Sequence, residues 1–139
     1  MMADRVHKVS YCYAMVPMRA GTGVKILSEL REAGVNLIAF SGFPAGNGRA
    51  QLDLVPEKMT KLRSLATRKG WKLGRTKNAF LIQGKDSVGA VNRHIKKLAA
   101  AKISVTAADA VCAGKGRYGM ILWVKPKDYA RAARALGAV

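Results

Sequence analysis

Acidic residues are scarce in this chain. Eight Asp and Glu stand against 25 Lys and Arg among 139 residues, which leaves a formal net charge of +17 at pH 7. Such an excess indicates either a nucleic acid or another acidic partner, or a basic surface that only keeps the protein soluble. No run of like charge reaches five or six residues, so the sequence does not indicate a basic tail.

Cysteine and histidine are rare, with two residues of each type: Cys12, Cys112, His7 and His94. The sequence contains no Cys-x-x-Cys pair, and the two histidines stand alone. We therefore predict neither a metal site nor a redox pair, and no cofactor. Both cysteines lie in apolar segments, where a buried, reduced thiol is expected.

The pattern of a catalytic site is also missing. We find no nucleophile–base pair and no matched pair of acids, and Glu29, Glu32 and Glu57 fall on predicted helix faces. His94 is expected on the solvated face of a Lys-rich helix. The sequence thus predicts a protein that is not an enzyme.

Long apolar runs are absent. Residues 1–6 have no apolar signal-peptide core, and no run approaches the roughly 18 apolar residues of a membrane helix. A cytoplasmic protein without membrane contact is expected.

One pattern of elements occurs twice. A single constant shift along the chain, which we call the repeat offset, superposes the landmarks of the two copies: Gly21 on Gly89, Gly34 on Lys102, Gly46 on Gly114 and Arg49 on Arg117. An internal repeat of this kind decides the architecture before any local assignment. It predicts two domains, at residues 1–75 and 76–139.

Periodicity and turn residues predict the elements of each copy. The first copy has strands at 7–17, 35–43 and 49–55, helices at 24–33 and 57–69, and a short closing strand at 71–73. The second has strands at 78–84, 103–113 and 118–124, a helix at 88–101 and a last helix that Pro126 opens. This order predicts an α+β fold of two ferredoxin-like βαββαβ units, the second truncated at its last strand, with antiparallel sheets and helices on one face.

Spacing also predicts which helix faces are buried. In the helix at 24–33 the inward stripe is Val24, Leu27 and Leu30, with Ile26 and Ala33 beside it. In the helix at 88–101 it is Val88, Val91, Ile95 and Leu98. Asp86 or Ser87 is expected to cap that second helix with its side chain.

The segment from Gly21 to Leu37 closely resembles an ACT domain in its turn glycine, its helix stripe and its Gly-Val-Asn-Leu exit. The resemblance covers nearly the whole chain as two tandem copies. It implies a free-standing regulatory protein whose effector, usually an amino acid, is held at an interface between ACT units. The family's turn commonly reads Asp-x-Pro-Gly, followed further on by Asn: the first copy keeps Gly21 and Asn36, and the second keeps Asp86 and Gly89 but has Ser104.

The residues themselves also favour a ligand at the first turn. Free amides and the positive dipole end of a helix stabilise a carboxylate there, and glycines allow its close approach. Arg19 can add a bidentate contact, and Asn36 offers both a donor and an acceptor. An ordinary turn remains the alternative for both copies. The candidate ligand-binding residues are Arg19, Ala20, Gly21, Thr22, Gly23, Asn36, Leu37, Asp86, Val88, Gly89 and Ser104.

RNA or DNA binding is the alternative function, because the RNA-recognition motif shares the βαββαβ order and stacks bases on exposed strand aromatics. Only 6% of residues are aromatic, and Tyr118 and Trp123 lie five positions apart, on opposite faces of a strand. We therefore favour a regulatory or sensor protein that binds a small molecule. We expect a homodimer, because open sheet edges are rarely left unpaired, and the basic surface suits an acidic protein partner.

Overall fold

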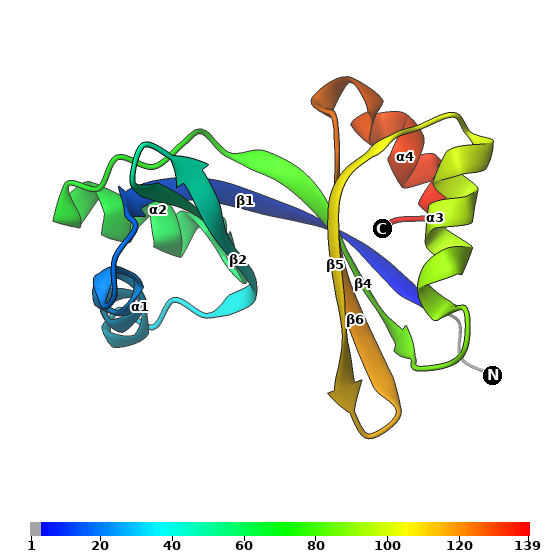
Figure 1. The fold of residues 1–139 in the computed structure, drawn as a ribbon, viewed down its shortest axis with the longest axis horizontal. Coiled ribbons are helices and arrows are strands. Elements are labelled where there is room, and N and C mark those ends of the chain that lie inside the picture. The colour runs from blue at the N-terminus through cyan, green and yellow to red at the C-terminus, as the bar shows by residue number, and fades with distance from the viewer. Residues whose placement is uncertain (1–3) are drawn as a thin grey trace. The chain divides into compact units, whose positions relative to one another are not determined.

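The computed structural model describes residues 4–139, which form six strands and four α-helices (Figure 1). The elements are β1 (Arg5–Pro17), α1 (Thr22–Glu32), β2 (Leu37–Gly46), β3 (Arg49–Pro56), α2 (Met59–Lys69), β4 (Lys77–Lys85), α3 (Ala90–Ala100), β5 (Val105–Gly114), β6 (Arg117–Val124), a 3-10 turn at Pro126–Asp128 and α4 (Tyr129–Leu136). Hydrogen bonding orders the strands β2-β3-β1-β4-β6-β5. The predicted α+β fold of two ferredoxin-like units is confirmed.

The chain divides into two compact units. We call residues 10–77 the first unit, and residues 4–9 together with 78–139 the second unit. Val6 packs into the core of the second unit, and its carbonyl accepts a 3.0 Å hydrogen bond from the Val139 amide. The predicted boundaries, 1–75 and 76–139, had instead placed residues 4–9 in the first domain.

The strand register repeats with the same repeat offset. Cys12 pairs with Leu54 between β1 and β3, and Phe80 pairs with Leu122 between β4 and β6. Every β2–β3 pair likewise recurs between β5 and β6, including the irregularities at both ends. The two copies therefore have the same backbone pairing, although their side chains differ widely.

The hairpin turns explain the repeated Gly-x-Gly-Arg pattern. All three residues from Gly46 to Gly48, and all three from Gly114 to Gly116, have a positive φ, including 54° at Asn47 and 55° at Lys115. Glycine adopts this conformation without steric cost, so each turn needs its two glycines.

The buried helix faces match the predicted ones only in part: Leu30 and Leu98 are buried as predicted, and Ile95 packs against the core. In α1 the inward residues are Leu30 with the partly buried Ile26, whereas Val24 is 65% exposed. In α3 they are Ala90, His94 and Leu98, and Val88 lies outside the helix, fully exposed. Val88 was misassigned because α3 begins only after Gly89, which leaves Val88 outside the helix. Leu27 and Val91, also predicted inward, are 37% and 39% exposed.

Three smaller predictions were also wrong. No side chain caps α3, because Gly89 in the left-handed conformation precedes the helix in place of Asp86 or Ser87. Residues 71–73 form no strand, and the segment after α2 is instead held by Arg63, which donates a 2.6 Å hydrogen bond to the Gly74 carbonyl. Cys12 is buried as expected, but Cys112 on the edge strand β5 is exposed.

None of the helices in residues 4–139 combines the length and apolar character that crossing a bilayer requires.

Candidate functional site

The turn from β1 to α1 borders a hollow of about 350 Å³ in the first unit. Its backbone is held by a 2.8 Å hydrogen bond from the Met18 amide to the Gly48 carbonyl, and Gly21 precedes the helix with φ 87°. No side chain caps α1, and its first turn has no acidic residue. The Thr22 amide donates to the Arg19 carbonyl at 3.4 Å, and the next amides of the first turn are available to an anion. The hollow is lined by Val16, Pro17, Met18, Arg19, Ala20, Thr22, Gly23, Ala50 and Leu52.

The second unit has a hollow of about 600 Å³ beside the turn from β4 to α3. The Asp86 amide donates to the Gly116 carbonyl at 2.8 Å, which is the counterpart of the bond from Met18 to Gly48 in the first unit. Gly89, with φ 82°, again precedes the helix without a side-chain cap. The lining residues are Asp86, Ser87, Gly89, Ala90, Val91, Asn92, Ile95, Ala110, Val111, Cys112 and Tyr118.

The two hollows occupy the same place in the repeat but differ in charge. Five lining positions correspond at the repeat offset: Met18 with Asp86, Arg19 with Ser87, Thr22 with Ala90, Gly23 with Val91 and Ala50 with Tyr118. The first hollow has a cation, Arg19, and the second has a carboxylate, Asp86. An anionic group is thus attracted to the first and repelled from the second.

The structure brings together only some of the predicted ligand residues. Arg19, Ala20, Thr22 and Gly23 line the first hollow and Gly21 caps its helix, while Asp86 and Gly89 line the second. Asn36 and Leu37 follow the other end of α1, and an 11-residue helix is about 16 Å long. Val88 and Ser104 are exposed outside the second hollow. Within one unit, the turn and the exit of the helix therefore cannot both contact one small ligand.

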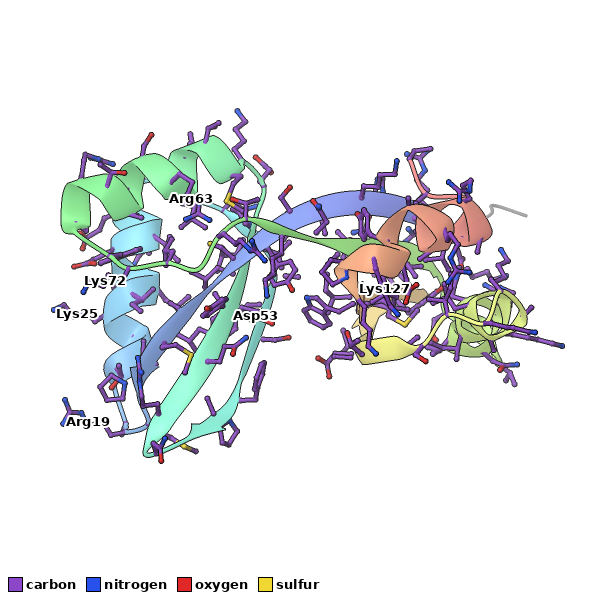
Figure 2. The ribbon with its side chains drawn as sticks, turned by 90° about the horizontal axis from the view of Figure 1, so that it is seen from above. Arg19, Lys25, Asp53, Arg63, Lys72 and Lys127 are labelled. Carbon is purple, nitrogen blue, oxygen red and sulfur yellow. The ribbon has the colours of Figure 1, made fainter. Side chains whose placement is uncertain are left out.

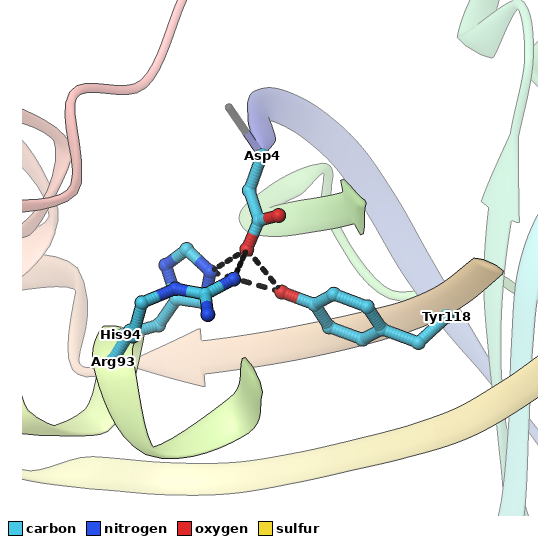
Figure 3. A network of polar contacts seen from close by, with 4 residues as sticks. All are labelled: Asp4, Arg93, His94 and Tyr118. Atoms are coloured by element: carbon cyan, nitrogen blue, oxygen red, sulfur yellow. Dashed lines mark hydrogen bonds and ion pairs between the residues drawn. The ribbon is translucent and has the colours of Figure 1, made fainter. Parts of the chain in front are cut away.

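Sequence reasoning missed a buried polar network in the second unit (Figure 3). Asp4 Oδ2 accepts hydrogen bonds from Tyr118 Oη at 2.5 Å and Arg93 at 2.9 Å, and lies 2.7 Å from His94 Nε2. The side chains of His94 and Asp4 are 4% and 7% exposed. His94 was expected on a solvated face. The repeat indicates otherwise, because the repeat offset superposes His94 on Ile26 and Leu98 on Leu30, which both face inward in α1.

Burial and hydrogen bonding shift the pKa values of two residues in this network, Asp4 downward and Tyr118 upward. Burial alone raises the pKa of Asp4, but hydrogen bonds from Tyr118, His94 and Arg93 together lower it below the usual value of 3.8. Burial and the hydrogen bond to Asp4 raise the pKa of Tyr118, so its phenol keeps its proton. The cluster is therefore held as a carboxylate surrounded by donors.

The first unit has an apolar version of the same position. His94, Tyr118 and Gly84 correspond by the repeat offset to Ile26, Ala50 and Val16. A Cβ on Gly84 would lie 2.5 Å from Asp4 Cγ and 3.1 Å from Tyr118 Cε1, so glycine provides the space for the network. The polar cluster thus distinguishes the two copies.

Another buried carboxyl, Asp53, lies on β3 of the first unit (Figure 2). It is 6% exposed and accepts a 2.9 Å hydrogen bond from Gln51 Nε2. Burial raises its pKa, while Gln51 and the charge of Lys77 oppose the rise. The two units therefore bury carboxyls whose pKa values shift in opposite directions.

The aromatic residues on β6 do not form a base-stacking surface. Tyr118 and Trp123 are 4% and 6% exposed, so neither ring can receive a base on its face. Across residues 4–139, no group of three His, Cys, Asp or Glu side chains is placed to hold a metal ion.

The fold is similar to that of several solved proteins. No protein-family model matches the chain, and no curated protein matches its sequence. Among solved structures, a protein from Bacteroides thetaiotaomicron is similar at 13% identity and a TM-score of 0.75, covering 96% of this chain and 88% of that one. The ligand-free regulatory subunit of aspartate kinase from Thermus thermophilus is similar at 16% identity and a TM-score of 0.60, covering 97% and 93%. The aspartokinase alpha and beta subunits match at 15% identity and a TM-score of 0.59, covering 97% and 95%.

Proposed function

We propose that the protein is a tandem ACT-type regulatory protein that binds an amino acid in the first hollow. The observation that carries this proposal is the hollow at the uncapped start of α1, where Arg19 and free amides face one space. A carboxylate there accepts from the first-turn amides and pairs with the guanidinium. The fold shared with aspartate kinase regulatory domains supports a binding module without chemistry of its own.

The first and second hollows are proposed to have different roles. Asp86 disfavours a carboxylate in the second hollow and suits an ammonium or hydroxyl group instead. The effector then favours one conformation of the protein through its differential contacts, and the output passes to another chain.

Gly23→Ala is expected to separate stability from binding. Gly23 lies in the first turn of α1, and nothing lies within 4 Å of an added Cβ, so the methyl group projects into open space at the hollow. Alanine should stabilise the helix by about 0.5–1 kcal/mol, yet weaken amino-acid binding tenfold or more by occupying the ligand's space. A thermal-shift screen with the twenty amino acids measures both effects, because a ligand at 100 times its dissociation constant adds about 2.7 kcal/mol.

Ser28→Ala is the matched control for this variant. Ser28 is exposed further along the same helix, outside the hollow, so its replacement should raise stability slightly and leave the ligand response intact. The proposal fails if no amino acid shifts the melting temperature, or if Gly23→Ala binds as well as the wild type.

Self-association is proposed to use the exposed edge strands. On β2, Phe40 and Phe43 are each 44% exposed, and on β5 Val111 is 67% exposed. Apolar edges of this kind favour strand pairing, and a lysine on an edge opposes it. In sedimentation velocity we expect a dimer for the wild type and a monomer for Phe43→Lys. Lys115→Gln, in the turn between β5 and β6, is the control and should stay dimeric. A monomeric wild type would contradict this assignment.

A further inference from the structure

One segment of the first unit has an unusual charge pattern. Residues 58–77, which cover α2 and the segment after it, contain eight Lys and Arg and no Asp or Glu. At the repeat offset, residues 58–71, with five Lys and Arg and no Asp or Glu, correspond to residues 126–139, which have Lys127, Arg131 and Arg134 together with Asp128. Because the folds correspond and the charges do not, the charge is not a requirement of the repeat.

Six of these Lys and Arg residues are exposed, and we call them the basic face: Lys58, Lys61, Arg68, Lys69, Lys72 and Arg75. Within the described residues, none of the six forms an ion pair with a carboxylate. Exposed Thr60, Ser64 and Thr67 lie among them on α2, whereas Leu62, Leu65 and Ala66 point into the core. The solvent side of α2 thus presents only bases and hydroxyls.

Arg63 holds the segment after the helix in place. Its guanidinium donates to the Gly74 carbonyl at 2.6 Å and to Thr76 Oγ1 at 3.0 Å, and the Gly74 amide donates to the Tyr13 carbonyl at 2.8 Å. Figure 2 shows Arg63 on α2 and Lys72 on the segment that follows. The basic side chains of α2 and of the segment after it are therefore presented together on a fixed backbone. This lowers the entropic cost of ordering them on binding.

We propose that the basic face binds the phosphate backbone of duplex DNA without reading its bases. Lysine, arginine and hydroxyl side chains are among those that contact DNA phosphates. A protein partner would favour aromatic and apolar residues and few lysines, and the exposed side of α2 has the opposite composition. Single-strand binding needs exposed aromatics for stacking, which this face lacks. A helix about 10–12 Å across fits the major groove of DNA, whereas that of an RNA duplex is too narrow.

Binding of a fluorescent 25-base-pair mixed-sequence DNA duplex, measured by anisotropy from 50 to 300 mM salt, tests this proposal. Six phosphate contacts predict a slope of about −5 in log K against log salt. The triple variant Lys61→Gln, Arg68→Gln, Lys72→Gln should bind at least tenfold more weakly, and its slope should lose about 3. Lys58→Gln, Lys69→Gln, Arg75→Gln is an independent second triple on the same face, with the same expected result.

A variant of equal charge change in the second copy is the control. Lys125→Gln, Lys127→Gln, Arg134→Gln removes three exposed bases around α4 and should weaken binding less than threefold. Equal losses in the control and in the triples would show a general charge effect and overturn the proposal. So would tighter binding to an RNA duplex, an acidic peptide or anionic vesicles, or no DNA binding at 50 mM salt. The amino-acid response should persist in both triples, because the hollow lies outside the basic face.

Discussion

Asp4→Ala is expected to lower the free energy of unfolding of the second unit by about 3 kcal/mol. The carboxylate is 7% exposed and accepts from three side chains, of which Tyr118 and His94 are buried. Its removal leaves those donors with only their mutual 3.0 Å contact, and unmatched buried polar groups are costly. Arg93, half exposed, can turn to water and adds little.

Urea unfolding monitored by tryptophan fluorescence measures this loss in one unit at a time. The chain has two tryptophans, Trp71 in the first unit and Trp123 in the second, so a Trp71→Phe background reports on the second alone. Asp128→Ala is the matched control, because it removes an ion pair to the half-exposed Arg131 and should cost less than about 1 kcal/mol. An Asp4→Ala loss no larger than that of Asp128→Ala would show that the network adds nothing to stability.

Urea unfolding should depend on pH with opposite signs in the two units, with the second unit followed by Trp123 in the Trp71→Phe background and the first by Trp71 in a Trp123→Phe background. The pKa of Asp4 is lower in the folded state, so its contribution is present above the unfolded value of about 3.9 and is lost as pH falls through the folded value. The pKa of Asp53 is raised, so its contribution is full at low pH and is lost as pH rises through the folded value. Asp4→Asn and Asp53→Asn should each abolish the corresponding dependence.

Gly84→Ala is expected to lower the free energy of unfolding of the second unit by about 3 kcal/mol, because it disturbs the same network. The added methyl group would overlap the Asp4 carboxylate and press on the Tyr118 ring, both of which are confined by the core. Gly119→Ala on the neighbouring β6 is the control: its nearest atom, the Ile82 carbonyl oxygen, lies 4.0 Å away, so little change is expected. Urea unfolding in the Trp71→Phe background again provides the readout.

A double-mutant cycle then separates overlap from ordinary loss of glycine. If the cost of Gly84→Ala comes from displacing the carboxylate, Asp4→Ala removes the obstacle, and the double variant should lose clearly less than the two single losses together. Simple additivity would instead assign the cost to the backbone of β4 and contradict the packing described.

The repeat made most of the architecture predictable. Because Gly21, Gly46 and Arg49 recur at one constant offset, the order of the elements and both hairpins followed from spacing alone. Even the inward face of α3 was accessible, since the repeat offset places His94 on Ile26. Direct counting failed at Val88, because Gly89 adopts a left-handed conformation and the helix begins only after it.

The polar network could not be predicted in the same way. Asp4 lies 90 residues from His94 in sequence, and the first copy offers no analogue, because Val16, Ile26 and Ala50 are apolar. Nothing in the composition of residues 5–17 marks where a single strand passes from one unit to another. Likewise, the charge of each hollow depends on which turn residues line it, and the sequence of the turn alone does not determine this.

The division of β1 between the units has a consequence for biosynthesis. Residues 4–9 leave the ribosome before the strands and helices of residues 78–139 with which they pack. During translation, domains generally form from the N-terminus onward, and residues 10–77 can do so without waiting. Residues 4–9 must instead stay without their partners until residues 78–139 have emerged, which leaves the core residue Val6 exposed to chaperones for that interval.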